Sequence, residues 1–298
     1  MRALKYKDEN EIEIAAVVEP SIKEYTSSMM ELCMRATISS GILVVVSIIS
    51  AFYFRLEDRM IFIMLFSSWI ICIIVTIIKY YNFKIIRDGY NIKISYGLIY
   101  KKEVNIPINT IQSLIIVEGV IKKPLGYFSL KVETIGYGKN KGHSTIICPI
   151  AKRKVLNKLI QDIIPEMNVT YVLRNSPAKA LNEFLLYKLL EELLVIGLIA
   201  IFIPNGYYIF FMIPFLIVWN NIRFKDNGLY YGNDFVVMRF RKLDRKTVII
   251  NKVFIQSFEK EQNIFQKRKS IAKYKVIIAG DRLGRTYKVG YISQNNFS

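Results

Sequence analysis

Two uncharged stretches near the N-terminus constrain the fold of this chain most strongly. Residues 36–54 and residues 60–78 each comprise nineteen residues without a charged side chain. A helix needs about 20 predominantly apolar residues to cross a bilayer, and both stretches come close to that length. Only the polar joint at 55–59 separates them. We therefore predict a transmembrane helical hairpin over residues 36–78, preceded by an N-terminal cytoplasmic segment, residues 1–35.

A third uncharged stretch, residues 193–221, is broken by the sequence Pro-Asn-Gly at 204–206, which is typical of a turn. Each of its arms is shorter than a comfortable span, although the first can be lengthened backwards through the charged residues at 188–192. We predict a second membrane hairpin over residues 193–221 that spans the bilayer. The alternative is a shallow hairpin that enters the membrane and returns on the same side.

The positive charge of the chain gathers in the two polar regions that follow the hairpins. The net charge is +18, with eighteen Lys and Arg against seven acids in residues 79–188 and seventeen against six in residues 223–298. Because positively charged flanks stay on the cytoplasmic side, we expect both regions and both termini in the cytoplasm of a multi-pass cell-membrane protein. Topology then explains most of the charge, and a dedicated binding surface is the alternative. Cys33, Cys72 and Cys148 share no metal or redox spacing and fit a reducing compartment.

The two polar regions resemble each other at a constant offset of 144 residues. The sequence IQS occurs at 111–113 and at 255–257, and the sequence KV occurs at 131–132 and at 275–276. Each copy begins just after an apolar hairpin. An internal repeat of this length is the signature of a duplicated structural unit. We infer that the unit consists of a hairpin plus a polar domain.

Within each copy the pattern is that of short strands. FKIIRDGYNIKISY alternates apolar and polar residues around Asp88-Gly89, which indicates a β-hairpin. The first copy ends in AKRKVLNKLIQDII, whose apolar residues recur at helical spacing. A small curved sheet capped by one amphipathic helix is the natural packing of these elements. The second copy repeats the strands but ends at SQNNFS, without an evident closing helix.

The stretch DGYNIKISYGLIYKKEVNIPINTIQSLIIVEGVIKKPLGYFSLKVETIG resembles the bacterial pleckstrin-homology-like domain of the YdbT-type membrane proteins. The resemblance rests on the Asp-Gly turn, YGL, the run from IP to IQS, LG and VET. The second copy is similar only in IQS, KV and its strand pattern. The resemblance covers about residues 36–294. It implies membrane helix pairs that alternate with such domains, in a binding or scaffolding module without established catalysis.

We therefore predict an α+β membrane protein with two transmembrane helical hairpins, each followed by a small pleckstrin-like β domain. The first domain is expected over residues 79–167, closed by a helix, and the second over residues 222–298, without one. Residues 168–192 are expected to form an amphipathic connection. The second copy is then degenerate, completed by a partner's helix, or cut short.

The sequence offers little for catalysis or transport. The only histidine, His143, lies in the loop GKNKGHST, without the convergent ligands that a metal site needs. The chain lacks the common nucleophile, phosphate-loop and zinc-protease motifs. Glu191 and Glu192 can each pair with Lys188 at helical spacing and indicate a charged helix end. We expect no enzyme activity, no metal and no cofactor, and no nucleic-acid partner, since aromatic residues fall in spans or alternate inward.

Lipid and protein remain as candidate partners, in addition to the bilayer itself. The Asp88-Gly89 turn is too short to cup a phosphoinositide headgroup. Non-specific contact with anionic lipid is expected from basic runs, namely Lys101, Lys102, Lys122, Lys123, Lys152, Arg153, Lys154, Lys267, Arg268 and Lys269. A missing closing helix leaves apolar surface that predicts an interface with a partner or with the first copy, around Val253, Phe254, Phe258, Tyr287 and Tyr291.

The predicted function is therefore that of a membrane-anchored binding or scaffold module. Its two cytoplasmic pleckstrin-like domains would recruit or assemble protein partners, including further copies of the chain. One alternative is a sensor of anionic lipid at the inner leaflet. Another is a non-catalytic subunit of a membrane enzyme or transporter.

Overall fold

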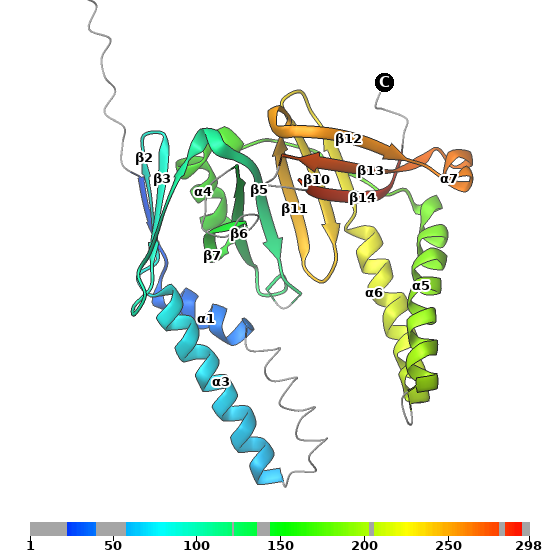
Figure 1. Ribbon diagram of the computed structural model, residues 1–298, viewed down its shortest axis with the longest axis horizontal. Coiled ribbons are helices and arrows are strands. Elements are labelled where there is room, and N and C mark those ends of the chain that lie inside the picture. The colour runs from blue at the N-terminus through cyan, green and yellow to red at the C-terminus, as the bar shows by residue number, and fades with distance from the viewer. Residues whose placement is uncertain are drawn as a thin grey trace, which may run out of the picture.

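The computed structural model describes residues 23–39, 58–120, 122–135, 144–202, 206–279 and 284–293. The fold is α+β, as predicted, and three antiparallel sheets lie beside apolar helices that leave them on one side (Figure 1). The first hairpin is described only in its second arm, α3 (Asp58–Tyr80), which contacts α1 (Met29–Ser39). The first arm of that predicted hairpin lies mostly outside the described residues.

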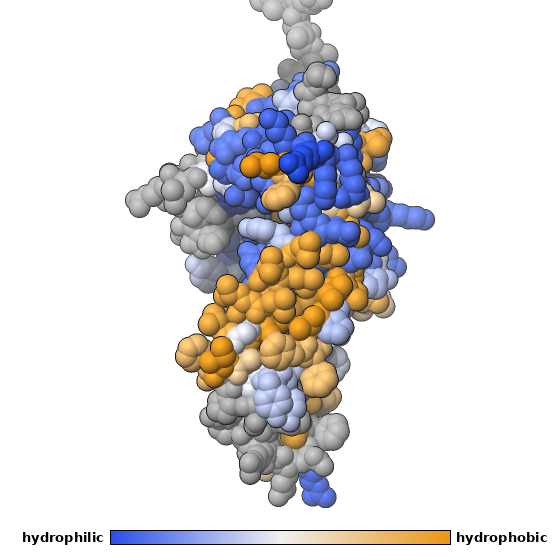
Figure 2. All heavy atoms as spheres, turned by 90° about the vertical axis from the view of Figure 1, so that its right-hand side faces the viewer, coloured by the Kyte–Doolittle hydropathy of each residue, from blue (hydrophilic) through white to orange (hydrophobic). Residues whose placement is uncertain are grey.

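Two helical stretches among the described residues are long and apolar enough to cross a membrane: residues 59–80, and residues 206–225, which end in α6 (Ile213–Lys225). The partner of α6 is α5 (Leu181–Phe202), which carries Lys188, Glu191 and Glu192 halfway along its length. The second predicted hairpin is therefore present as a helix pair in which one arm meets the requirements of a span. Apolar side chains gather over this pair, below a largely hydrophilic upper part (Figure 2).

The first sheet consists of β1 (Lys23–Thr26), β2 (Lys84–Asp88), β3 (Asn91–Tyr96) and β4 (Lys102–Pro107), in that order. The predicted hairpin is present, since β2 and β3 pair with Asp88 opposite Asn91 and with Gly89 at a φ of 56° in the turn. The sequence gives no sign of β1, which comes from the N-terminal segment and pairs with β2.

The central sheet joins the two copies. Its order is β7 (Thr145–Lys152), β6 (Tyr127–Thr134), β5 (Ile111–Glu118), β11 (Arg245–Asn251), β10 (Phe235–Arg241), β9 (Gly228–Tyr231) and β8 (Arg174–Asn175). The junction is the antiparallel pair of β5 with β11. The sequence did not predict this junction, through which both copies contribute strands to one seven-stranded sheet.

The third sheet belongs to the second copy alone. It consists of β12 (Ile255–Glu261), β13 (Ile271–Ile278) and β14 (Arg285–Ser293), with the short α7 (Ile264–Arg268) between β12 and β13. The first copy ends in α4 (Arg153–Ile163), which buries Leu156, Leu159, Ile160 and Ile163 at the predicted helical spacing.

The central sheet is covered on both faces, so each copy completes the core of the other. Ile116 of β5 and Ile249 of β11 belong to a core that includes the first sheet and α4. Ile115 and Val248 point the opposite way, into a core shared with the third sheet. A strand covered on both faces must be apolar at consecutive positions. This requirement explains the run LIIV in β5, which is buried along its whole length.

Candidate functional site

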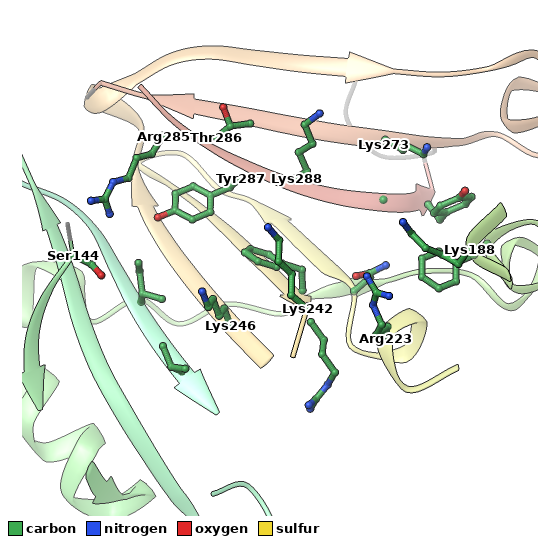
Figure 3. Close-up of a pocket in the computed structure, with 18 of the residues that line it drawn as sticks. Ser144, Lys188, Arg223, Lys242, Lys246, Lys273, Arg285, Thr286, Tyr287 and Lys288 are labelled. Carbon is green, nitrogen blue, oxygen red and sulfur yellow. The ribbon is translucent and has the colours of Figure 1, made fainter. Parts of the chain in front are cut away.

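A cleft of about 850 Å³ opens between the two copies, on the face of the central sheet opposite the first sheet. Its walls come from β5 and β6 of the first copy, from β10, β11 and β14 of the second, and from α5 and α6. Figure 3 shows Lys242 and Lys246 beneath the residues of β14, with Ser144 at one end and Arg223 at the other. A cleft of this volume has the size of a small-ligand site.

The cleft is strongly cationic. Of the ten charged side chains that line it, nine carry positive charge: Lys131, Lys188, Arg223, Arg241, Lys242, Lys246, Lys273, Arg285 and Lys288. The tenth is Glu133. Walls of one sign and low dielectric concentrate the electrostatic field inside a cleft. The arrangement is therefore suited to an anion.

Strand register places Lys131 and Lys246 of the central sheet on one face. Lys131 of β6 lies opposite Ile115 of β5, and Lys246 of β11 lies opposite Val117 of β5. Because side chains alternate along a strand, Lys131 shares its face with Glu133, two positions on. Apolar residues of β5 thus form a floor between two rows of charged side chains.

Carboxylates already neutralise part of this charge. Arg285 pairs with Glu133 across the two copies, and Arg241 Nε lies 2.5 Å from the Asp226 carboxylate at the end of α6. Glu192 accepts a hydrogen bond of 2.7 Å from Asn220. Arg285 and Arg241 are therefore held in place by carboxylates of the protein. They help to shape the cleft but add little uncompensated charge to it.

Four lysines keep their charge for the cleft. Among the described residues, no carboxylate oxygen lies within the 4.0 Å of an ion pair from Lys131, Lys242, Lys246 or Lys288. Lys273 stands over an aromatic ring, with its Nζ 4.9 Å from the centroid of the neighbouring tyrosine of α5. The uncompensated charge therefore lies in the middle of the cleft.

Two lysines of this region, Lys131 and Lys122, carry lowered pKa values. Burial, followed by the charge of Lys246, lowers the pKa of Lys131. Beside it, Lys122 donates a hydrogen bond of 3.0 Å to Ser129, and burial together with the charge of Arg35 lowers the pKa of Lys122 to about 8. Desolvation and like charge both disfavour the protonated amine. A bound anion would relieve both effects.

Comparison with known proteins agrees with the duplicated architecture. The family model for the bacterial PH domain matches the chain twice, over residues 36–165 and residues 181–298. The chain belongs to this family. The first match includes α3 and the strands that follow it, and the second begins with α5 and α6 and continues through their strands, so the repeat read from the sequence is also the unit of the family.

The chain is similar to the UPF0699 transmembrane protein YdbT of Bacillus subtilis (strain 168), with 28% identity over 291 residues. The alignment covers 88% of this chain and 59% of that relative, so the chain spans about three fifths of its length. The resemblance stated from the sequence is thereby confirmed. The molecule is a membrane protein with two bacterial PH-like domains.

The ten basic residues predicted as lipid contacts do not line the cleft. Lys101 and Lys102 lie between β3 and β4, Lys122 and Lys123 between β5 and β6, and Lys152, Arg153 and Lys154 where β7 meets α4. Lys267 and Arg268 end α7, followed by Lys269, which lies 3.6 Å from Glu183 of α5. These runs thus lie at four places along the chain, and none of them lines the cleft.

The surface predicted to remain uncovered in the second PH-like domain is mostly absent. Both tyrosines are buried. Tyr287 is covered by the central sheet, and Tyr291 packs edge-on against Phe184 of α5. Phe254 and Phe258 are half-buried, and only Val253 is largely exposed, at 83%. Of the two predicted alternatives, an interface with the first copy fits Tyr287, which shares a buried core with Ile115 and Val117 of β5.

Two further predictions concern charged groups. Glu191 pairs with Lys188 at 2.5 Å, but both residues lie halfway along α5 and not at the predicted helix end. The loop that contains His143 lies outside the described residues. Within the described ranges, no three potential metal ligands of the His, Cys, Asp and Glu types come together.

Sequence reasoning did not identify the cleft. Its cations come from seven separate strands and helices and from the turn between β10 and β11, and no local run of charge marks them. A usable signal exists in β6, where Lys131 interrupts the strand on the phase that faces the cleft. Charged residues on the inward phase of an otherwise apolar strand indicate that a polar space, and not a core, lies above that position.

Proposed function

We propose that this protein binds anionic lipid headgroups of the cytoplasmic leaflet in the cleft between its PH-like domains. The observation that supports this proposal is the excess of cations in the cleft, nine of ten charged lining residues. The protein then acts by binding and not by catalysis. Both domains and both termini lie on the cytoplasmic side in this proposal.

The position of the cleft favours a lipid over a soluble anion. Arg223 in the last turn of α6 and Lys188 of α5 both line it. These helices form the apolar pair that continues toward the membrane, so the charged residues that precede the apolar part of α5 and follow that of α6 mark the level of the headgroups. A headgroup can therefore reach the cleft while its acyl chains remain beside the helices.

The chemistry of the lining favours phosphate. Lysine ammonium groups act as compact charges that can follow a phosphodiester in several orientations. The bound arginines present additional N–H donors, since one guanidinium has five of them. The full chain in an uncharged detergent is expected to bind dioctanoyl phosphatidylglycerol and not dioctanoyl phosphatidylcholine, with an affinity that falls as salt is added. Equal binding of the two lipids would overturn the proposal.

Binding is expected to weaken as the pH rises from about 7 to about 9. The pKa of Lys122 is lowered to about 8, so free protein loses this proton within that interval, whereas an anion favours the protonated form. Loss of one nearby charge corresponds to about 1 kcal/mol, or about fivefold in affinity. Lys122→Arg keeps its charge and should flatten the profile. Calorimetric titration at both pH values checks this, and an unchanged slope in the variant contradicts it.

Tyr207 offers a test of the proposed topology. It is 55% exposed at the start of the helical stretch 206–225, next to the turn of the second hairpin. If the hairpin spans, Tyr207→Cys should react with a membrane-impermeant maleimide added to intact cells. Val253→Cys should react only after permeabilisation, with Cys33 replaced by serine in both. Labelling of Tyr207→Cys only in permeabilised cells would favour the shallow hairpin.

A second function, the recruitment of protein partners, is favoured by the free edge of β12. This strand ends the third sheet, and its side chains Gln256 and Lys260 are exposed. The unpaired backbone groups of an edge strand can accept a further strand. A photo-crosslinker at Gln256 should give an adduct of defined mass, which distinguishes a second copy from a subunit of an enzyme or transporter. A crosslinker at Lys93 is the control, and identical adducts from both positions would contradict the assignment.

A further inference from the structure

We infer that three turns of the PH-like domains insert apolar tips into the headgroup region of the membrane in which the helices are anchored. These contact turns are residues 97–101 between β3 and β4, the described residues 119–120 and 122–126 between β5 and β6, and residues 242–244 between β10 and β11. Among the described residues of these turns, Lys242 alone also lines the cleft, and the inference does not depend on what the cleft binds.

Each contact turn exposes apolar side chains next to lysines. Ile99 is 80% exposed, Leu125 is 50% exposed and Leu243 is 66% exposed. The adjacent exposed lysines are Lys101, Lys102, Lys123 and Lys242. An apolar tip flanked by lysines suits an anionic leaflet, because lysine stems extend along apolar surface while their ammonium groups reach the phosphates.

Contacts with the ends of membrane helices fix the level of these turns relative to the membrane. The backbone N–H groups of Gly97 and Leu98 donate to the carbonyls of Tyr81 and Ile78, both at 2.9 Å, at the end of α3. The second turn reaches the end of α6. Lys123 Nζ lies 4.0 Å from the carboxylate of Asp226, the residue that caps the C-terminus of α6.

The third turn is attached to the same capping residue, Asp226. Arg241 and Arg245 flank this turn and lie 2.5 Å and 3.2 Å from the Asp226 carboxylate. All three turns are therefore tied to the point where a membrane helix enters a PH-like domain. In Figure 1 the turns after β5 and β10 point to the side on which α3 and α6 leave the sheets.

The first turn has a backbone that keeps its apolar residues outward. Gly97 has a φ of 112°, and a Cβ at this position would lie 2.2 Å from the carbonyl oxygen of Tyr100. Only glycine fits this close approach. The geometry leaves Ile99 and Tyr100 as the outermost side chains, at 80% and 83% exposure, beside the end of α3. Tyrosine at that level is typical of the membrane interface.

Two other exposed residues provide matched controls. Tyr90 is 87% exposed in the turn at the other end of β3, and Val253 is 83% exposed beyond the other end of β11. Each control thus shares a strand with one contact turn but lies a strand length further from the membrane helix. The controls and the contact turns are therefore similar in exposure but differ in their distance from the membrane helices.

The test uses the full chain in nanodiscs that contain phosphatidylglycerol. Single cysteines at Ile99, Leu243, Tyr90 and Val253, in a background without Cys33, Cys72 and Cys148, carry an environment-sensitive fluorophore. Ile99→Cys and Leu243→Cys are expected to give blue-shifted emission, with at least twofold quenching by lipids spin-labelled near the headgroup. Tyr90→Cys and Val253→Cys should show the emission of a probe in water. Equal emission and quenching at all four positions would overturn the inference.

Hydrogen exchange of the unmodified chain provides a second measurement, which needs no substitution. Amides of residues 97–101 and 242–244 are expected to exchange at least fivefold more slowly in anionic nanodiscs than in detergent, whereas those of residues 252–254 should not change. Unchanged rates in the two turns would contradict the inference. If the turns are inserted and the cleft still does not select phosphatidylglycerol, the proposed function fails and this inference stands.

Discussion

Replacing Lys131 and Lys246 together by glutamine is expected to weaken the binding of dioctanoyl phosphatidylglycerol about 30-fold, since two charges at about 1 kcal/mol each correspond to that factor. Both side chains line the cleft, and neither lies within ion-pair distance of a carboxylate in the described part of the chain. Their charge is therefore available to a ligand. Glutamine keeps a similar length and polarity, so the loss reports charge and not packing.

The matched control removes the same net charge elsewhere. Lys158 of α4 and Lys260 of β12 are exposed and lie outside the cleft. The double variant Lys158→Gln, Lys260→Gln should bind within about twofold of the unaltered protein, because exposed charges beyond a Debye length are screened. Calorimetric titration at two salt concentrations measures both variants. An equal loss in both would mean that net charge, and not the cleft, determines binding.

The sequence predicts the elements of this fold far better than the way in which they associate. The duplication, the turn at Asp88-Gly89 and the helix that closes the first copy all follow from local patterns, which the structure reproduces. The pairing of β5 with β11 does not follow from local patterns, because it joins strands that are more than a hundred residues apart in the sequence. Hydrophobic periodicity indicates which face of a strand is buried, but it does not indicate which other strand pairs with it.

A comparison of the two copies nevertheless contains a signal for the junction. After the shared IQS, β5 continues as LIIVE and β12 continues as FEKE. A strand covered on both faces reads as a continuous apolar run, whereas an edge strand carries charges. The difference marks Ile111–Glu118 as the strand at the junction and Ile255–Glu261 as the free edge.

The cleft was harder to foresee than the basic runs. Lys101 and Lys102, or Lys267 to Lys269, attract notice because they are adjacent in sequence, yet they occupy separate surfaces. The cleft gathers single cations from strands of both copies, and only the register of the central sheet brings Lys131 and Lys246 to one face. That register depends on the junction, so an error about the junction also hides the site.

The junction itself is expected to hold both PH-like domains in one cooperative unit, and Arg245→Met tests this. Arg245 of β11 pairs with Glu118 of β5, whose side chain is only 3% exposed, and its Nη1 lies 3.2 Å from Asp226. Removal of the guanidinium leaves a buried carboxylate without a counter-charge, which typically costs about 3–5 kcal/mol. The free energy of unfolding, measured in mixed micelles by circular dichroism, should fall by that amount.

Two further variants separate the buried charge from the general loss of an ion pair. Lys93→Met breaks a pair of 2.5 Å with Asp88 whose side chains are 54% and 47% exposed, and it should cost less than about 1 kcal/mol. The double variant Glu118→Gln, Arg245→Met removes the unpaired charge and should recover at least half of the loss. Equal effects of Arg245→Met and Lys93→Met would mean that the junction contributes no buried ion pair.

The shape of the unfolding curve carries the architectural part of this prediction. Because β5 and β11 share backbone hydrogen bonds and each copy completes the core of the other, the polar part should unfold in one transition. Arg245→Met weakens the contact between the copies more than either copy alone. We therefore expect it to broaden or split the transition, while Lys93→Met only shifts it. Two transitions in the unaltered protein would show that the shared sheet does not couple the domains.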